Sequence, residues 1–255
     1  MNAHYAVPDS PRSIAAYERA YLASDFEPVQ ARMRKRMLLT LLERLMPRRI
    51  LEVGCGSESL YTHWPNFDSF LVVEPGTGFA EKARRNAVGD TRIAIIEDFV
   101  ETAAPKLAGE VFDLILVSGL LHEVPDPAAV LKGLHPLCGP DSVVHVNVPN
   151  ARSVHRLLAL EMDLIDNLQT MSDRQQALQQ QRTFDMESLV SLCEQCGFKV
   201  NEQGSYFIKP FTHSQMSGLQ SSGLLEERML DGLYRLERHL PGLGSEIYVN
   251  LGRRE

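Results

Sequence analysis

The stretch that decides the fold is Arg49-Ile-Leu-Glu-Val-Gly-Cys-Gly-Ser57. Its first half is an apolar run rich in β-branched residues, which is typical of a strand buried in a parallel sheet. The run breaks at Gly54 and Gly56 and a polar segment follows, so we expect the strand to lead into the N-terminus of a helix. Glycine allows positive φ angles and lets the backbone approach a ligand closely. The stretch therefore predicts a ligand-binding loop at the carboxyl end of the first strand.

A carboxylate follows the next apolar run, Phe70-Leu-Val-Val73, at Glu74. An acidic residue at the tip of the second strand, roughly 20 residues past the glycines, is the usual partner of ribose hydroxyls in nucleotide-binding α/β folds. A dinucleotide fingerprint would place a third glycine where this chain has Ser59. A nicotinamide dinucleotide is therefore the less favoured ligand.

Glu52, the Gly-Cys-Gly loop and the Val73-Glu-Pro75 tip together resemble the class I S-adenosylmethionine (SAM)-dependent methyltransferases. The resemblance implies SAM as cofactor, S-adenosylhomocysteine (SAH) as product, and a glycine loop that passes the methionine part of the cofactor. It also implies a doubly wound, Rossmann-like α/β fold with a seven-stranded, mostly parallel sheet in the order 3-2-1-4-5-7-6, its last strand antiparallel. The cofactor-binding residues that it implies are Glu52, Gly54, Cys55, Gly56, Glu74, Pro75, Asp98, Phe99, Ser118 and Gly119.

Two further strand ends complete the expected cofactor crevice. The apolar run at 93–96 leads to Asp98, which the resemblance places against the adenine amino group, with Phe99 near the ring. A carboxylate can accept a hydrogen bond from an exocyclic amino group, and the alternative reading of Asp98 is a helix N-cap. The run at 112–119 supplies a second wall, since ligands in open α/β sheets bind beyond the carboxyl ends of strands.

The alternation of strands with helical segments predicts a parallel sheet covered on both faces, with right-handed crossovers. With 255 residues, of which 44% are hydrophobic and 23% charged, we expect one globular domain over residues 1–255. Its expected parts are N-terminal helices at 12–46, a SAM-binding core at 49–150, a helical lid at 151–182 and the C-terminal half of the sheet at 183–255. The last two strands are expected at 205–210 and 246–251, with a helix near 225–240 between them.

Composition disfavours several partners. The formal net charge of −7 argues against a dedicated nucleic-acid binder, and we interpret the basic cluster at 32–36 as a solvated helix face. No apolar segment is long enough to span a membrane and no signal peptide is evident, which predicts a cytoplasmic protein without a membrane partner. Cys193 and Cys196 share an apolar helical stripe, so we interpret them as buried structural thiols and expect no metal site.

Segments beyond the glycine loop resemble bacterial small-molecule methyltransferases of the ubiquinone-type and natural-product group. They lie at 148–156, 182–189, 196–198 and 209–216. Such relatives commonly carry a histidine two positions before the residue corresponding to Arg182, where this chain has Gln180, so no role of that histidine is transferred. We predict methyl transfer to a small-molecule acceptor, with oxygen as the favoured atom and secondary metabolism as the setting, by a monomer or homodimer. The alternatives are a SAM-binding scaffold without turnover and, less favoured, an NAD-dependent oxidoreductase.

Histidine suits removal of a proton from a hydroxyl acceptor near neutral pH, whereas a carboxylate acceptor would need no base. We rank His122, after the fourth strand, first as the catalytic base and His155, at the start of the lid, second. Orientation or packing is the competing role for both. The candidate substrate-binding residues are Tyr17, Tyr21, Asn150 and Arg182, with core or surface packing as the alternative for the tyrosines.

Overall fold

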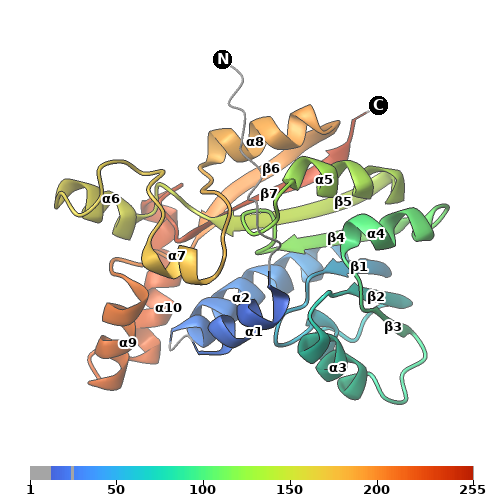
Figure 1. The fold of residues 1–255 in the computed structure, drawn as a ribbon, viewed down its shortest axis with the longest axis horizontal. Helices are drawn as coiled ribbons and strands as arrows, with labels where there is room; N and C mark the ends of the chain where they lie inside the picture. Colours follow the sequence, from blue (N-terminus) through green and yellow to red (C-terminus); the bar gives the residue numbers. More distant parts are fainter. Residues whose placement is uncertain (1–12, 24–25, 255) are drawn as a thin grey trace.

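The computed structural model describes residues 13–23 and 26–254, and residues 12, 24 and 25 of the expected N-terminal helical region lie outside these ranges. Seven strands form one sheet in the order β3-β2-β1-β4-β5-β7-β6 (Figure 1). The strands are β1 (Arg49–Val53), β2 (Ser69–Val73), β3 (Ile93–Ile96), β4 (Phe112–Ser118), β5 (Cys138–Pro149), β6 (Phe198–Tyr206) and β7 (Glu246–Arg253). The first five are mutually parallel, and β7 runs antiparallel to both β5 and β6. The predicted fold class and strand order are therefore confirmed.

Helices connect the strands and cover the sheet. The α-helices are α1 (Ile14–Leu22), α2 (Glu27–Leu45), α3 (Thr77–Asn86), α4 (Val100–Ala103), α5 (Pro127–Leu134), α6 (Val154–Glu161), α7 (Asp173–Ala177), α8 (Met186–Gln195), α9 (His213–Ser221) and α10 (Glu227–Arg235). Short 3-10 helices follow at η1 (Leu60–Thr62), η2 (Ala104–Leu107), η3 (His135–Leu137) and η4 (Leu236–His239). α5 starts as the sequence predicts, since the Asp126 side chain caps it by accepting from Ala129 N at 2.9 Å.

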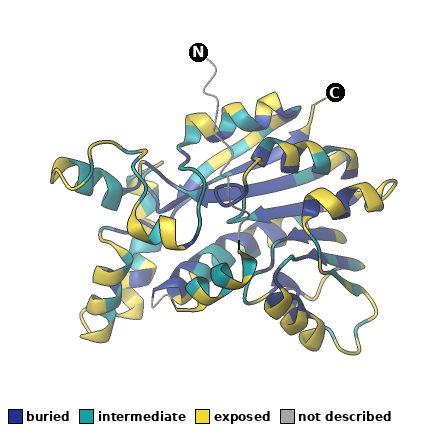
Figure 2. Cartoon of the chain, viewed as in Figure 1, coloured by how far each residue is buried: buried dark blue, intermediate teal, exposed yellow. Residues whose placement is uncertain are grey.

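The two faces of the sheet carry separate hydrophobic cores because side chains alternate along each strand. Leu51 and Ile115 belong to one core, together with residues of α4, α5 and α8. Ile50 and Leu114 belong to the other, where α2 and α3 cover the sheet. Figure 2 shows the central strands almost wholly buried, as expected for a sheet covered on both faces.

The segment after β1 differs from the expectation. No α-helix follows the glycine loop, and the chain forms η1 before it turns at Pro65 into β2. Leu60, Tyr61 and Trp64 are all buried against the core, so this short connection packs as a compact turn. The anion-binding helix N-terminus expected here is therefore absent between β1 and β2.

In the C-terminal half of the chain, the sequence-based prediction misplaces one strand and misses one helix. The sixth strand was expected at 205–210, but β6 begins at Phe198 and ends where Phe207 takes a φ of 58°. The exposed face of β6 is polar, so the sequence of this strand lacks the apolar run by which the other strands were recognised. α9 was not predicted, because its apolar residues are sparse and Met216 is its one buried residue.

The segment at 151–182, which we expected to form a helical lid, contains the two helices α6 and α7, and neither contains a buried residue. Figure 1 shows the lid gathered with α9 and α10 at one end of the sheet. The lid also contacts the N-terminal segment: Ser13 N donates to Gln179 Oε1 at 2.9 Å, and Gln179 Nε2 donates to Ser13 O at 3.0 Å. Two hydrogen bonds thus join α1 to the lid.

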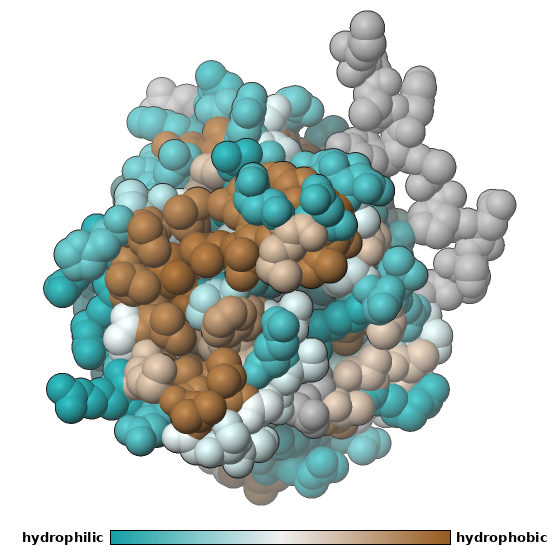
Figure 3. Space-filling view, turned by 90° about the vertical axis from the view of Figure 1, so that its left-hand side faces the viewer, coloured by the Kyte–Doolittle hydropathy of each residue, from teal (hydrophilic) through white to brown (hydrophobic). Residues whose placement is uncertain are grey.

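The end face of the molecule that carries the lid is rich in apolar side chains (Figure 3). The exposed large hydrophobic residues of the lid and of the α9–α10 region are Leu158, Met162, Leu164, Phe211, Leu224 and Met229. Across residues 13–23 and 26–254, no helix has both the length and the apolar character needed to cross a membrane.

Candidate functional site

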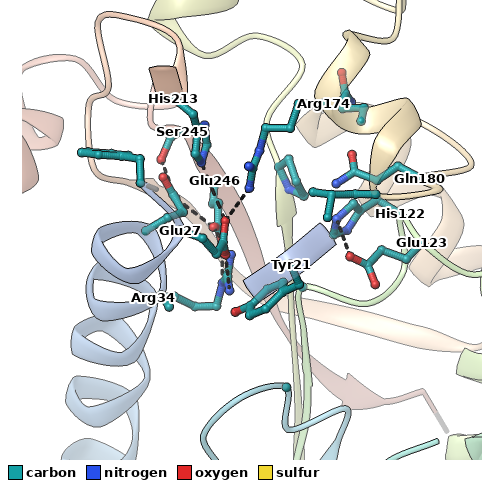
Figure 4. Close-up of a pocket in the computed structure, with 18 of the residues that line it drawn as sticks. Tyr21, Glu27, Arg34, His122, Glu123, Arg174, Gln180, His213, Ser245 and Glu246 are labelled. Atoms are coloured by element: carbon teal, nitrogen blue, oxygen red, sulfur yellow. Dashed lines mark hydrogen bonds and ion pairs between the residues drawn. The ribbon is translucent and has the colours of Figure 1, made fainter. Parts of the chain in front are cut away.

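A cavity of about 1230 Å³ lies at the carboxyl ends of β1, β2, β4 and β5. α1, α2, the lid and the start of α9 all contribute residues to its lining (Figure 4). Pockets for one drug-sized ligand measure about 300–1,000 Å³, so this cavity has room for a nucleoside cofactor and a small second molecule.

The glycine loop and the end of β2 are tied together at the floor of the cavity. Gly54 and Gly56 have φ angles of 77° and 56°, which favour glycine. Glu74 accepts hydrogen bonds from Gly56 N at 3.1 Å and from Gly76 N at 2.8 Å. Burial raises the pKa of the Glu74 carboxyl above its usual value. A carboxylate has about four acceptor sites, so Glu74 can hold these two amides and still accept from a ligand hydroxyl.

Glu52 fixes the turn after the glycines. Its carboxylate accepts from the Ser59 hydroxyl and from Leu60 N at 3.2 Å. Burial raises the pKa of Glu52 to about 7. Ser59, at the position where a dinucleotide fingerprint has glycine, therefore serves as a partner of Glu52 that shapes the loop.

The remaining residues of the glycine loop and the β4 end also line the cavity, among them Cys55, Pro75, Ser118 and Gly119. The Ser118 hydroxyl donates to Asn147 Oδ1 at 2.6 Å, which joins the ends of β4 and β5. Gly119 has a φ of 68°, and its α-carbon faces the guanidinium of Arg34. Burial raises the pKa of the Cys55 thiol, so it stays protonated at neutral pH.

Asp98 and Phe99 lie apart from the residues that line the cavity. The Asp98 carboxylate accepts from Lys106 at 2.9 Å and from Phe99 N at 2.8 Å. Phe99 is 48% exposed. Their predicted contact with adenine stays a prediction, and in this structure Asp98 forms an ion pair with Lys106.

All four candidate substrate-binding residues line the cavity. Two of them, Tyr17 and Tyr21, lie on α1. The rings of Tyr17 and Tyr21 are 5.9 Å apart, and burial raises the pKa of Tyr21 to about 12. Asn150 uses its amide structurally, since Nδ2 donates to Gly242 O and Gly244 O while Oδ1 accepts from Arg152 N.

The two candidate bases occupy different surroundings. His122 is buried after β4, with Nε2 at 3.7 Å from a Glu123 carboxylate oxygen. Its carbonyl accepts from Gln181 N at 2.8 Å, which ties the lid to β4, and Arg182 donates to the nearby Pro125 carbonyl at 2.5 Å. Burial lowers the pKa of His155 well below its usual value, which makes it a weaker base than a solvent-exposed histidine.

Comparison with known proteins gives a consistent answer. A family model described as a methyltransferase domain matches residues 26–203, more than half of the chain. The chain belongs to this methyltransferase family. Two ubiquinone biosynthesis O-methyltransferases of Actinobacillus pleuropneumoniae resemble it: one (serotype 5b) is 30% identical over 112 residues, and the other (serotype 7) is 25% identical over 175 residues. These alignments span 42% and 66% of this chain, and 47% and 73% of the relatives' lengths.

Solved structures share the fold of this methyltransferase at low sequence identity. A SAM-dependent methyltransferase of Thermotoga maritima, described as a possible histamine N-methyltransferase, matches with a TM-score of 0.59 and 19% identity over 94% of this chain and 96% of that one. The N-methyltransferase NodS of Bradyrhizobium japonicum, solved with SAH, matches with a TM-score of 0.57 and 11% identity over 94% and 99%.

The methyltransferase also contains a buried ion network that the sequence did not reveal. Arg34 donates from Nε to Glu246 Oε2 at 3.0 Å and from Nη2 to Oε1 at 2.5 Å. Gln30, Asn147 and Tyr206 also donate to the same carboxylate. Burial alone would raise the pKa of Glu246, but Arg34 and these hydrogen bonds lower it to about 2. The interpretation of residues 32–36 as a solvated face is therefore wrong for Arg34, because α2 directs it toward β7.

A second group of charges lies beside this network (Figure 4). Arg174 of the lid donates to Glu27 Oε2 at 2.7 Å, and His213 Nε2 lies 3.7 Å from the same atom. Burial alone would raise the pKa of Glu27, but His213, Arg34 and Arg174 bring it below its usual value. Lys209 places Nζ 2.8 Å from His213 Nδ1. These residues come from segments far apart in the chain, and the resemblance of the 209–216 segment did not reveal that Lys209 and His213 lie beside Glu27 and Arg174.

Proposed function

We propose that this chain is a SAM-dependent methyltransferase that methylates a hydroxyl oxygen of a small-molecule acceptor. The observation that carries the proposal is the glycine loop tied to buried Glu74 at the floor of a cavity with room for two ligands. Membership of the methyltransferase family supports SAM as the cofactor. The O-methyltransferase relatives support oxygen as the acceptor atom.

The residues at the cavity floor fit the cofactor. Gly54 and Gly56 present backbone without side chains, and Glu74 presents a carboxylate that can accept from ribose hydroxyls. Glu52 and Glu74 give this end an acidic character, which suits the positive sulfonium and ammonium groups. Bound SAM supplies an electrophilic methyl group whose transfer leaves the bonding pair on sulfur.

The protein's part in the reaction is to align the acceptor and to remove its proton. Holding two reactants in line can contribute about 7–11 kcal/mol to lowering a barrier. His122 is our proposed base, since it lines the cavity directly after β4. The net charge of −7 supports a small-molecule acceptor over nucleic acid. We propose a cytoplasmic enzyme of secondary metabolism, active as a monomer or homodimer.

The melting temperature, measured with SAH and with NAD, tests which of the two kinds of cofactor the protein binds. SAH at about 100 times its dissociation constant should raise the melting temperature by about 5 °C or more, whereas NAD should leave it unchanged. Glu74→Ala should shrink the SAH shift, because it removes the proposed ribose partner. Glu97→Ala, at the nearby surface pair with Arg84, is the matched control and should keep the shift. A shift with NAD and none with SAH would reject the proposal.

Turnover tests the base and separates an enzyme from a SAM-binding scaffold. A metabolite panel with labelled SAM should first identify a hydroxyl acceptor. With that acceptor, His122→Ala should lower kcat about 10²–10⁴-fold and leave SAH affinity nearly unchanged. Full activity of His122→Ala would refute the base assignment, and a panel without any methylated product would favour the scaffold.

A further inference from the structure

Cations and carboxylates are unevenly distributed over the lining of the cavity. The cofactor end contains the carboxylates of Glu52 and Glu74. The rest of the lining contains more cations than carboxylates. Its charged groups are the cations Arg32, Arg34, Lys35, Arg156, Arg174, Arg182 and Lys209, against the carboxylates Glu27, Glu58, Glu123 and Glu246.

Among the cations of the lining, Lys209 is important for its burial and for the partner of its ammonium group. It is 3% exposed and lines the cavity. Its ammonium contacts His213 Nδ1 at 2.8 Å, and no carboxylate of residues 13–23 or 26–254 forms an ion pair with it. Glu27, the nearby acid, pairs with Arg174 at 2.7 Å. Burying a lysine without a carboxylate partner is costly, and here burial lowers its pKa to about 7.

The orientation of His213 leaves donors of Lys209 available. Nε2 of His213 faces the Glu27 carboxylate at 3.7 Å, which favours a proton on Nε2 and leaves Nδ1 to accept. One N–H of Lys209 therefore donates to Nδ1. An ammonium has three donors, so two remain for an acceptor in the cavity.

The first turn of the lid adds two nitrogen-bearing side chains. The Arg156 guanidinium donates to the carbonyls of Leu168 at 2.8 Å and Thr170 at 2.7 Å, which are neutral partners. Its Nε is buried without a hydrogen-bond partner in the part of the chain that the structure describes. His155 lies among these groups, since Lys209, His213 and Arg156 all act with burial to lower its pKa.

We propose that the methyl acceptor carries a carboxylate, and that this carboxylate binds Lys209 in the space bordered by His155, Arg156 and His213. An incoming anion would give Lys209 the ion partner that residues 13–23 and 26–254 do not supply. The lid residues Arg156 and His155 would then close over the acidic group, while the acceptor hydroxyl points toward the cofactor end. This inference rests on the proposed function, because it names the substrate class of the same site.

The test uses a matched pair of probes with the SAH-loaded protein of residues 1–255. 4-Hydroxybenzoate carries a hydroxyl and a carboxylate, and 4-hydroxybenzamide has nearly the same shape without the charge. Calorimetry should show tighter binding of the benzoate to the wild type. Lys209→Met should weaken the benzoate about 30-fold or more, as expected for removal of one partner of a buried charge pair, and leave the amide little changed. Lys199→Met, at an exposed lysine of β6, should bind both probes as the wild type does.

Proton uptake gives a readout that needs no variant. At about pH 8 most Lys209 side chains would be neutral, so binding of the benzoate should take up most of one proton, and binding of the amide should take up none. Calorimetry in two buffers of different ionisation enthalpy measures this uptake. The charged groups that act on Lys209, and whose own protonation the pH series must follow, are Arg174, Glu27, Glu246, His213 and His155.

The outcomes separate the two proposals. If SAH fails to bind the wild type, the proposed function fails. If SAH binds but the wild type does not prefer the benzoate, or if Lys209→Met keeps that preference, the carboxylate site alone is overturned. Unchanged SAH affinity of Lys209→Met confirms that the variant is folded.

Discussion

Gly54→Val is expected to weaken SAH binding by about a hundredfold or more, equivalent to about 3 kcal/mol. The backbone at Gly54 borders the cavity floor with a φ of 77°, so a side chain there enters the space that the cofactor needs. Leu120 Cδ1 would lie 3.9 Å from a new Cβ, so the protein itself has room for one carbon atom. The expected loss therefore comes from exclusion of the ligand. Calorimetric titration of SAH into each variant measures it.

Gly109→Val is the matched control for backbone strain. Gly109 has a φ of 93°, a Cβ there would meet no atom within 4 Å, and the residue lies outside the cavity lining. Both variants should lose about 1–3 kcal/mol of stability because valine resists positive φ. SAH affinity should fall in Gly54→Val alone. Equal affinities in the two variants would remove the glycine loop from the proposed cofactor site.

Glu246→Ala is expected to lower the free energy of unfolding by about 3–5 kcal/mol. The change would remove the bidentate partner of Arg34 and leave it Glu27 at 3.7 Å, and the Gln30 and Asn147 amides would lose their acceptor. Urea denaturation measures the effect. Arg34→Met with Glu246→Leu should recover part of the loss, because an apolar pair removes the unpaired charge.

Glu227→Ala is the control for loss of an ion pair at the surface. Glu227 pairs with Arg32, and their side chains are 69% and 46% exposed, so its removal should cost no more than about 1 kcal/mol. If Glu246→Ala lowered the free energy of unfolding by a similarly small amount, the ion network around Glu246 would not have the stabilising role expected of it.

The pH dependence follows from the same carboxylate. The folded pKa of about 2 lies below the ordinary value of 4.5, so the stabilisation by Glu246 is complete above 4.5 and is lost as pH falls toward 2.

The arrangement of the proposed cofactor end could be predicted from the sequence because its signals are local. The glycine loop follows a strand directly, and Glu74 follows the next one, so strand periodicity places both at one edge. The arrangement of the proposed acceptor end could not, because its contacts are distant: Arg34 and Glu246 are 212 positions apart, and Arg174 and Glu27 are 147. In the sequence, nothing distinguishes Arg34 from the other basic residues at 32–36, which we interpreted as solvated. Its partner became evident once β7 was placed beside β5.

The pair of hydrogen bonds between Ser13 and Gln179 joins two segments that lie 166 positions apart in the chain. Separation of the N-terminal helix from the segment at 151–182 would break both bonds. Each solvent-exposed bond contributes about 1 kcal/mol, so this contact holds the two cavity walls together only weakly. A ligand that touched both segments would therefore add stability to a contact that the protein alone makes with two bonds.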